Sequence, residues 1–352
     1  METSEIISIK EYDYELPKEL IAQTPSEKRE NCRMMVLDKS NQTIEHKHFY
    51  DITDYFDEND VIVLNNTKVI PARLFGRKNT GAHIEVFLLK QIGEKTWEVL
   101  INPSKRVKEE SLIEISPDMY VKVLTRQNEG KWLVELHYDG DFYEILDKVG
   151  NIPLPPYIER NMTDEQLKNL DYDRYQTVYA QKEGSVAAPT AGLHFTKEIL
   201  KKLEDKGVQI CDVTLNVGLG TFRPVKVDNI VEHQMDSEQF EIPAKTAKII
   251  TEAKKQGKKI TAVGTTTVRT LETCMQKYDE ILETIDDSTL FIYPGFKFRV
   301  VDKLITNFHL PKSTLIMLTS AFAGKDFVFK AYEEAIKEQY KFYSYGDCML
   351  IK

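Results

Sequence analysis

The sequence contains few cysteines, and no pattern would use them together. Its 352 residues include four cysteines, which lie tens of residues apart without a C-x-x-C pair. This spacing provides neither a zinc cluster nor a dense disulfide framework, and it favours a reducing compartment. The seven histidines never fall at i and i+3 or i+4 on a predicted helix, so we expect no metal site.

The chain also lacks a long apolar segment and a secretory signal. Residues 1–10 include two glutamates and no apolar core, and the most apolar stretch, Ser313–Gly324, is twelve residues long. About 20 apolar residues are needed to span a bilayer. We therefore expect a cytoplasmic protein with no membrane partner.

What the sequence does contain indicates a globular protein of two domains. At about 150 residues per domain the length suggests two, and 41% hydrophobic with 10% aromatic residues excludes disorder as the main theme. The net charge of −9 argues weakly against nucleic acid, but residues 68–108 hold nine Lys or Arg against three Glu, a local charge of +6. This basic segment either contacts phosphates or forms a solvated strand face.

Hydrophobic periodicity divides the chain into three zones. Val61–Leu64 is continuously apolar, which is typical of a strand buried on both faces. From about residue 69 to 150, short alternating segments separated by Gly, Asp and Asn predict an antiparallel barrel or sandwich. Beyond Pro153–Pro156, helical and strand-like runs alternate. We predict an α/β fold: a mixed α/β main domain formed by residues 1–65 and 153–352, with an antiparallel β-domain, either a barrel or a sandwich, inserted at 66–152.

The expected elements of the main domain follow from the same periodicity. A short helix is expected after Pro17. The other expected helices are Thr196–Lys206, Ala244–Lys255, Thr266–Lys277 and Phe327–Phe342, and the expected strands are Arg33–Asp38, Asp60–Asn65, Gln209–Asn216, Ile260–Val263, Leu290–Ile292 and Thr314–Thr319.

Several segments rich in small and polar residues follow predicted strands, where α/β folds bind ligands. In the first, Asn65 and Thr67 can bond the amide or hydroxyl edges of a ligand, and Lys68 and Arg73 can hold an anion. The alternative is a turn with two solvated cations.

The loop Gly184–Thr196 is unusually free of charge. Its only titratable side chain is His194, which lies just before a helix capped at Thr196. Small residues let the backbone approach a ligand closely, and a histidine can act as an acid or base near neutral pH. The alternative is a structural loop with a hydrogen-bonded histidine.

Four further segments carry candidate groups. Val217–Pro224 contains a Gly-x-Gly, but it lacks the third glycine and the following helix of a dinucleotide-binding loop. His233–Glu238 gathers acid, base and hydroxyl groups, although an exposed polar turn explains it equally well. Gly264–Arg269 leads from a strand into a helix whose N-terminus can bind a carboxylate. Asn307 and His309 precede the apolar stretch.

Seven runs, spread over nearly the whole chain, carry a family resemblance. They are Leu64–Leu74, Tyr175–Tyr179, Gly184–Thr196, Val217–Pro224, Phe291–Gly295, Ile305–Thr314 and Tyr343–Asp347. In this order they resemble the S-adenosylmethionine:tRNA ribosyltransferase-isomerases of queuosine biosynthesis. Two positions depart from the family pattern, which has His where this chain has Asn216 and Asp236. Catalytic duties of those two histidines therefore do not transfer unchanged, although Asp236 can accept a proton.

The resemblance implies a two-domain fold, a mixed α/β domain interrupted by an inserted antiparallel β-barrel domain. It also implies an enzyme that moves the ribosyl carbons of S-adenosylmethionine onto 7-aminomethyl-7-deazaguanine at the tRNA wobble position. The product is epoxyqueuosine-tRNA, and adenine and methionine leave. The expected partners are a tRNA with a GUN anticodon and S-adenosylmethionine, which is a consumed co-substrate, so no cofactor is expected. We expect a monomer.

This chemistry requires a base next to the sulfonium, a proton donor to adenine and a dry pocket. The titratable candidates are His194, which we favour, His309, His233 and Glu238, and Arg269 is the expected partner of the methionine carboxylate. The expected substrate-binding residues are Asn65, Thr67, Lys68, Arg73, Tyr179, Pro189, Thr190, Gly192, Phe195, Gly218, Gly220, Thr221, Phe222, Thr265, Thr266, Arg269 and Asn307; those expected to contact tRNA are Lys105, Arg106 and Lys108.

Two other functional classes compete with this assignment. A common α/β methyltransferase has its glycine-rich loop after the first strand, whereas the glycines here come late, at Gly218. A non-catalytic RNA-binding protein has no need of the uncharged loop at 184–192. The released products distinguish the three: adenine with methionine, S-adenosylhomocysteine, or none.

Overall fold

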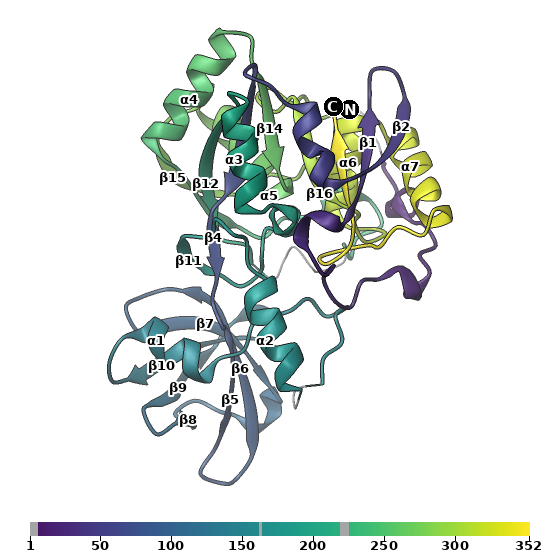
Figure 1. Cartoon of the computed structure of the whole chain (residues 1–352). Coiled ribbons are helices and arrows are strands. Elements are labelled where there is room, and N and C mark those ends of the chain that lie inside the picture. Colours follow the sequence, from purple (N-terminus) through teal and green to yellow (C-terminus); the bar gives the residue numbers. More distant parts are fainter. Residues whose placement is uncertain (1–5, 162–163, 219–224) are drawn as a thin grey trace, which may run out of the picture.

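The computed structural model describes residues 6–161, 164–218 and 225–352, and it contains two bodies (Figure 1). One is built on a nine-stranded sheet with the strand order β15-β13-β12-β3-β14-β16-β17-β1-β2, and the other is a closed barrel with the order β10-β7-β6-β5-β8-β9. The prediction of a mixed α/β domain with an antiparallel β-barrel is confirmed. Among the described residues, no helix is long and apolar enough to cross a membrane.

The nine strands of the sheet come from both ends of the chain. Four pairs at the centre and near one edge are parallel (β12 with β3, β3 with β14, β14 with β16, and β1 with β17), and the other pairs are antiparallel. The strands are β1 (Arg33–Asp38), β2 (Thr43–His48), β3 (Asp60–Asn65), β12 (Gln209–Leu215), β13 (Glu238–Ile242), β14 (Lys259–Val263), β15 (Thr284–Ser288), β16 (Lys303–Asn307) and β17 (Cys348–Ile351).

Strand β3 shows why the sheet is covered on both faces. All six of its residues are buried, as its continuous apolar sequence predicts. Because side chains alternate along a strand, Val61 and Val63 join one core cluster, and Ile62 and Leu64 join another. The first cluster includes residues of α4 (Ala244–Lys255), α5 (Thr265–Tyr278), α6 (Thr314–Ala323) and α7 (Lys325–Lys337), and the second includes residues of α3 (Lys197–Asp205).

The barrel has its own core. Alternate residues of its strands point inward, so that Trp97, Val99 and Ile101 of one strand are buried between half-exposed neighbours. Helix α1 (Phe142–Val149), which the periodicity did not predict, adds Ile145 and Leu146 to this core. The strands are β5 (Arg73–Arg77), β6 (His83–Gln91), β7 (Thr96–Asn102), β8 (Leu112–Ser116), β9 (Met119–Arg126) and β10 (Lys131–Tyr138).

The two bodies are connected by an incoming segment, which leads into the barrel, and an outgoing segment, which leads back to the main domain. The chain passes toward the barrel through β4 (Thr67–Val69), which pairs in parallel with β11 (Lys182–Ser185). At the barrel itself, Arg73 and Asn151 exchange two backbone hydrogen bonds of 3.1 and 2.9 Å. Helix α2 (Glu165–Arg174) follows on the return path. The incoming and outgoing segments therefore meet at one place.

Three sequence-based predictions in the main domain are wrong. Thr314–Thr319, predicted as a strand, belongs to helix α6, whose N-terminus is capped by Ser313 Oγ accepting from the Ile316 backbone N–H at 3.3 Å. Most of this helix is buried, so its apolar residues show no helical period. Leu290–Ile292 is not a strand, because the edge strand lies just before it, at β15. The helix expected after Pro17 is a single 3-10 turn, Lys18–Leu20.

Candidate active site

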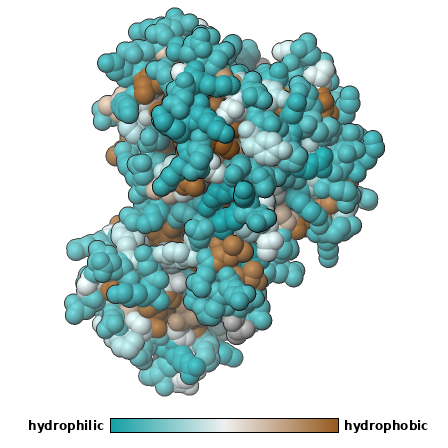
Figure 2. All heavy atoms as spheres, viewed as in Figure 1, coloured by the Kyte–Doolittle hydropathy of each residue, from teal (hydrophilic) through white to brown (hydrophobic). Residues whose placement is uncertain are grey.

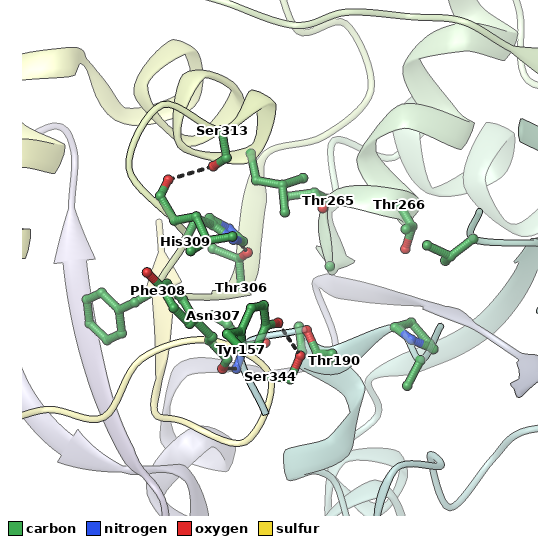
Figure 3. Close-up of a pocket in the computed structure, with 18 residues that line it drawn as sticks. Tyr157, Thr190, Thr265, Thr266, Thr306, Asn307, Phe308, His309, Ser313 and Ser344 are labelled. Carbon is green, nitrogen blue, oxygen red and sulfur yellow. Dashed lines mark hydrogen bonds between the residues drawn. The ribbon is translucent and has the colours of Figure 1, made fainter. Parts of the chain in front are cut away.

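A small pocket lies where strands β12, β14 and β16 end. It has a volume of about 60 Å³, room for roughly four to six water molecules. Tyr157 and Ser344, which bond to each other at 2.6 Å, lie on its wall (Figure 3). The described residues that line it are Tyr157, Ala188, Pro189, Thr190, Ala191, Val217, Gly264, Thr265, Thr266, Thr306, Asn307, Phe308, His309, Leu310, Ser313, Leu315, Tyr343 and Ser344.

Within the described chain, no Asp, Glu, Lys or Arg lines this small pocket. Its only imidazole belongs to His309, whose Nε2 lies 2.8 Å from Thr306 Oγ1. Burial lowers the pKa of His309 to about 3. At neutral pH the pocket therefore carries no formal charge, and His309 acts there as a neutral hydrogen-bonding group.

The buried His309 makes stability depend on pH in a predictable way. An unfolded histidine binds a proton below about pH 6.5, whereas folded His309 stays neutral down to about pH 3, so stability is lost as the pH falls through this range. Between pH 7 and pH 5 we expect a loss of about 2 kcal/mol from this group. Urea unfolding at both pH values should show a smaller pH effect in His309→Gln than in the parent. Equal pH effects in the two proteins would contradict the assignment.

A second, larger cavity separates the two bodies. This interdomain cleft has a volume of about 780 Å³, within the range of ligand sites. The barrel contributes Lys90, Trp97, Glu98, Lys131 and Tyr143, and the main domain contributes Glu183, Asn216, Gly218, Asp236 and Glu238. Val217 lines both the cleft and the small pocket, so the two spaces are neighbours. On the face shown in Figure 2, hydrophilic residues cover most of both bodies.

The two departures from the family pattern both lie in this cleft. Asn216 Oδ1 accepts a hydrogen bond from Thr67 Oγ1 at 2.8 Å, and Asp236 is exposed. Gly184 lies against Asn216 with a φ of +136°, and a Cβ there would come within 3.2 Å of the Asn216 amide nitrogen. The positions thus face the space where a second substrate would enter.

Two predicted site residues are paired with each other. Arg269 and Glu238 form an ion pair through Nη1 and Oε2, and both side chains are at most 5% exposed. The guanidinium also donates to the backbone oxygens of Leu290 and Ser288 at 3.1 and 3.3 Å, and Glu238 Oε1 accepts from the Gly218 N–H at 3.0 Å. The Arg269 guanidinium therefore already has protein partners. Its predicted contact with a ligand carboxylate would require it to leave Glu238 or the two backbone oxygens.

His194 is buried behind the small pocket rather than lining it. Its Nδ1 lies 3.0 Å from Cys32 Sγ, and its Nε2 lies 3.1 Å from the amide nitrogen of Asn307, which does line the pocket. The structure thus connects His194 to the pocket through Asn307. Its role as an acid or base stays a prediction.

Cys32, His194 and Cys348 place three potential metal ligands within 4.8 Å of one another. A histidine that binds a metal usually donates from its other ring nitrogen to an acceptor. Here that nitrogen faces the Asn307 NH₂ group, which is a donor. The arrangement suits a hydrogen-bond chain better than a metal, and the prediction of no metal site stays a prediction.

The first predicted segment is tied to the protein. Asn65 is fully buried and bonds the backbone of Leu215 in both directions, at 3.0 and 3.1 Å. Lys68 pairs with Glu183 at 3.1 Å, and Arg73 pairs with Glu85 at 2.7 Å. These side chains fix the strand ends and the base of the barrel.

The remaining predicted residues are distributed as follows. Pro189, Thr190, Thr265 and Thr266 line the small pocket. His233 is half-buried against Phe291, and burial lowers its pKa. Gly220, Thr221 and Phe222 lie outside the described residues. Lys105, Arg106 and Lys108 are exposed on the barrel and form no ion pair within the described part of the chain.

Tyr179, Gly192 and Phe195 belong to the packing beneath the site. Phe195 packs edge-on against Phe49 and is fully buried. Gly192 lies directly on Tyr179: a Cβ at residue 192 would come within 2.0 Å of the Tyr179 hydroxyl oxygen. Only glycine fits this contact.

The contact predicts a destabilised variant. Gly192→Ala should lower the free energy of unfolding by about 1–3 kcal/mol, because the added methyl group overpacks the core. Tyr179→Phe, which removes the hydroxyl group, should recover part of the loss. Gly93→Ala is the matched control, since its nearest neighbour lies at 3.6 Å. Urea unfolding measures all three, and a Gly192→Ala protein as stable as the control would refute the packing argument.

Several residues of the site were not predicted. Tyr157, Tyr343 and Ser344 line the small pocket, and the barrel residues Lys90 and Lys131 line the cleft. Tyr343 and Ser344 lie in one of the runs that resemble the family, and this resemblance is the feature of the sequence that could have identified them as site residues. The cleft residues come from strands whose mutual position depends on the fold.

The geometry defines an α/β protein with an inserted β-barrel, whose pocket at the strand ends adjoins an interdomain cleft at Val217. Comparison with known proteins agrees. Residues 9–351 match the family described as queuosine biosynthesis protein. The chain belongs to this family.

Curated relatives match along nearly their full length. A protein of Sulfurihydrogenibium sp. (strain YO3AOP1) is 53% identical over 98% of this chain and 100% of its own, and one of Fusobacterium nucleatum is 50% identical over 97% and 96%. Both are named S-adenosylmethionine:tRNA ribosyltransferase-isomerase. A crystal structure of an S-adenosylmethionine tRNA ribosyltransferase from Thermotoga maritima is 40% identical, with a TM-score of 0.56 over 97% of this chain and 100% of that one.

Proposed function

We propose that the protein transfers and isomerises the ribosyl moiety of S-adenosylmethionine onto the aminomethyl group of 7-aminomethyl-7-deazaguanine in tRNA. The products are epoxyqueuosine-tRNA, adenine and methionine. The observation that carries the proposal is that relatives with this name match from end to end at 50–53% identity. The methyltransferase and RNA-binding alternatives have no such support.

The two neighbouring spaces suit two substrates. The small pocket takes the adenine moiety, because adenine is an uncharged part of S-adenosylmethionine and no charged side chain of the described residues lines this pocket. The rest of S-adenosylmethionine then extends past Val217 into the interdomain cleft, where the tRNA base brings its amine. In this arrangement the bond that joins adenine to the ribosyl carbons lies between the two spaces, shielded from bulk water.

The proton that leaves the carbon beside the sulfonium must be taken up on the cleft side. The main domain contributes three carboxylates to the cleft, those of Glu183, Asp236 and Glu238. Glu183 is paired with Lys68. Glu238 is buried in its pair with Arg269, whereas Glu183 and Asp236 are exposed. These two exposed carboxylates are therefore the candidates to accept this proton.

The histidines take different positions relative to the adenine. His309 serves it as a neutral hydrogen-bonding partner, since its low pKa leaves the ring unprotonated near neutral pH. His194 and His233 act at a distance from the small pocket, because neither lines it in the described structure.

The partners follow from the substrates. The modified base occurs at the wobble position of tRNAs with a GUN anticodon, so these are the tRNAs that the enzyme takes. S-Adenosylmethionine is consumed and no further cofactor is needed. We place the enzyme in the cytoplasm, with its tRNA, and as a monomer.

One assay tests this function. The purified protein is incubated with S-adenosylmethionine and tRNA that carries the aminomethyl base, and the small products are quantified by mass spectrometry. Adenine and methionine in equal amounts, with a matching mass increase of the tRNA, support the proposal. S-Adenosylhomocysteine would instead indicate a methyltransferase, and binding of tRNA without turnover would indicate a binding protein. tRNA with an unmodified guanine is the control.

A further inference from the structure

A chain of buried hydrogen bonds fixes the orientation of the Asn307 side chain. Its amide nitrogen lies 3.1 Å from the Tyr343 carbonyl oxygen, 3.4 Å from the Asp347 carbonyl oxygen and 3.1 Å from His194 Nε2. An amide NH₂ group only donates hydrogen bonds and has two protons, so its two nearer neighbours, at 3.1 Å, accept them and the Asp347 carbonyl oxygen is a weaker, shared acceptor. His194 Nε2 is therefore an acceptor, and Nδ1 is the ring nitrogen that carries a proton.

The proton on His194 Nδ1 points at a sulfur atom. It faces Cys32 Sγ at 3.0 Å, inside a region where both side chains are at most 5% exposed. Burial, with a smaller contribution from the adjacent Cys348, raises the pKa of the Cys32 thiol well above its usual range. Cys348 in turn donates to the Arg33 carbonyl oxygen at 3.7 Å. The sulfur of Cys32 thus holds the histidine in the tautomer that can accept from Asn307.

The other end of the same amide has no partner among the described residues. The nitrogen is turned toward its acceptors, and Asn307 is one of the residues that line the small pocket. Oδ1 is buried, and it accepts no hydrogen bond from any residue that the structure describes. A buried carbonyl oxygen without a donor is costly, so a ligand that supplies one gains affinity.

We propose that Asn307 Oδ1 accepts a hydrogen bond from the 6-amino group of adenine, and that His194 and Cys32 are positioning residues that hold this oxygen in place. The inference rests on the proposed function, which puts the adenine moiety in the small pocket. Among the described lining residues no carboxylate is present to balance an ammonium group, so the methionine end does not belong there. In the nucleoside form, the 6-amino group carries the only N–H donors of adenine.

The test compares two probes, 9-methyladenine and 9-methylpurine, called adenine and purine in the binding tests below; the second lacks only the 6-amino group, and neither has a ring N–H. Isothermal titration of the parent protein should give adenine an affinity about tenfold or more above that of purine, because purine leaves Oδ1 unsatisfied. Asn307→Ala should reduce this ratio to near one. A variant that merely loosened the pocket would weaken both ligands together and leave the ratio unchanged.

Cysteine variants test the positioning role. Cys32→Ala removes the acceptor of the His194 proton and should lower the adenine-to-purine ratio at least threefold, whereas Cys32→Ser, which keeps an acceptor atom, should restore most of it. Cys211→Ala is the matched control, because Cys211 is equally buried in another core cluster of the same domain, and it should leave the ratio unchanged. Thermal unfolding verifies that each variant is folded.

The outcomes separate this inference from the function on which it rests. Equal binding of adenine and purine by a protein that releases adenine and methionine would overturn the role of Asn307 and leave the function standing. A normal ratio in folded Cys32→Ala would overturn the positioning role of Cys32. Failure to release adenine from S-adenosylmethionine in the turnover assay would count against the proposed function itself.

Discussion

Replacing Arg269 with methionine should lower the free energy of unfolding by about 3–5 kcal/mol. The variant leaves the carboxylate of Glu238 buried without its cation, and both side chains are at most 5% exposed in the parent. A lone buried carboxylate is poorly solvated, and the Gly218 N–H alone does not compensate its charge. Urea unfolding at neutral pH measures the loss.

A double variant separates this structural role from ligand binding. Glu238→Gln keeps an oxygen for the Gly218 N–H but removes the charge, so Arg269→Met combined with Glu238→Gln should recover at least half of the lost stability. If Arg269→Met is instead as stable as the parent and only its affinity for S-adenosylmethionine falls, then Arg269 is a ligand partner, as the sequence alone predicted.

Replacing Lys105, Arg106 and Lys108 together with glutamine should weaken tRNA binding strongly at low salt. Removal of one phosphate-binding charge flattens the slope of log affinity against log salt concentration by about 0.7–0.9. The triple variant should therefore flatten this slope by about 2–3. The positive charges of the three residues are exposed and form no ion pair in the described ranges, so they are available to phosphates. Filter binding or anisotropy at several salt concentrations measures the slope.

The position of these residues strengthens the test. They follow β7, whose last residue, Asn102, pairs with Glu85 of β6. The cleft residue Lys90 lies farther along β6, about 16 Å from Glu85 at about 3.3 Å per residue. A tRNA whose base enters the cleft would therefore run along the barrel.

Lys245, Lys248 and Lys255 on α4, exposed at the end of the molecule far from the barrel, are the matched control triple (Figure 1). Unchanged affinity for tRNA in the barrel variant would show that the basic segment is only a solvated strand face. Affinity for S-adenosylmethionine should stay at the parent level in both triple variants.

Much of the fold could be predicted because its signals are local. The apolar run at β3 and the alternation along the barrel strands depend only on neighbouring residues, and both predictions are confirmed. Helix α6 was mistaken for a strand because a helix buried on nearly all sides has no polar face. Helix α1 was missed because eight residues contain only two helical turns.

The site could be predicted only in part. Loops that follow strands were correctly expected to line a pocket, since Pro189, Thr265 and Asn307 meet there. The pairing of Arg269 with Glu238 joins residues 31 positions apart on different elements, and nothing local signals it. The tautomer of His194 depends on Cys32, which is 162 positions away and carried no predicted role.

The contact between Arg73 and Asn151 makes the barrel an inserted domain whose two ends are adjacent in space. Its first strand begins at Arg73, and its last connecting residue, Asn151, is hydrogen-bonded to the same backbone, so the two ends of the inserted unit meet. A unit whose ends touch can be gained, exchanged or lost by a host chain without a gap to bridge. The sheet would keep all nine of its strands after such an event, because none of them comes from the barrel. The inserted barrel can therefore diversify in evolution while the sheet and the pocket at its strand ends stay the same.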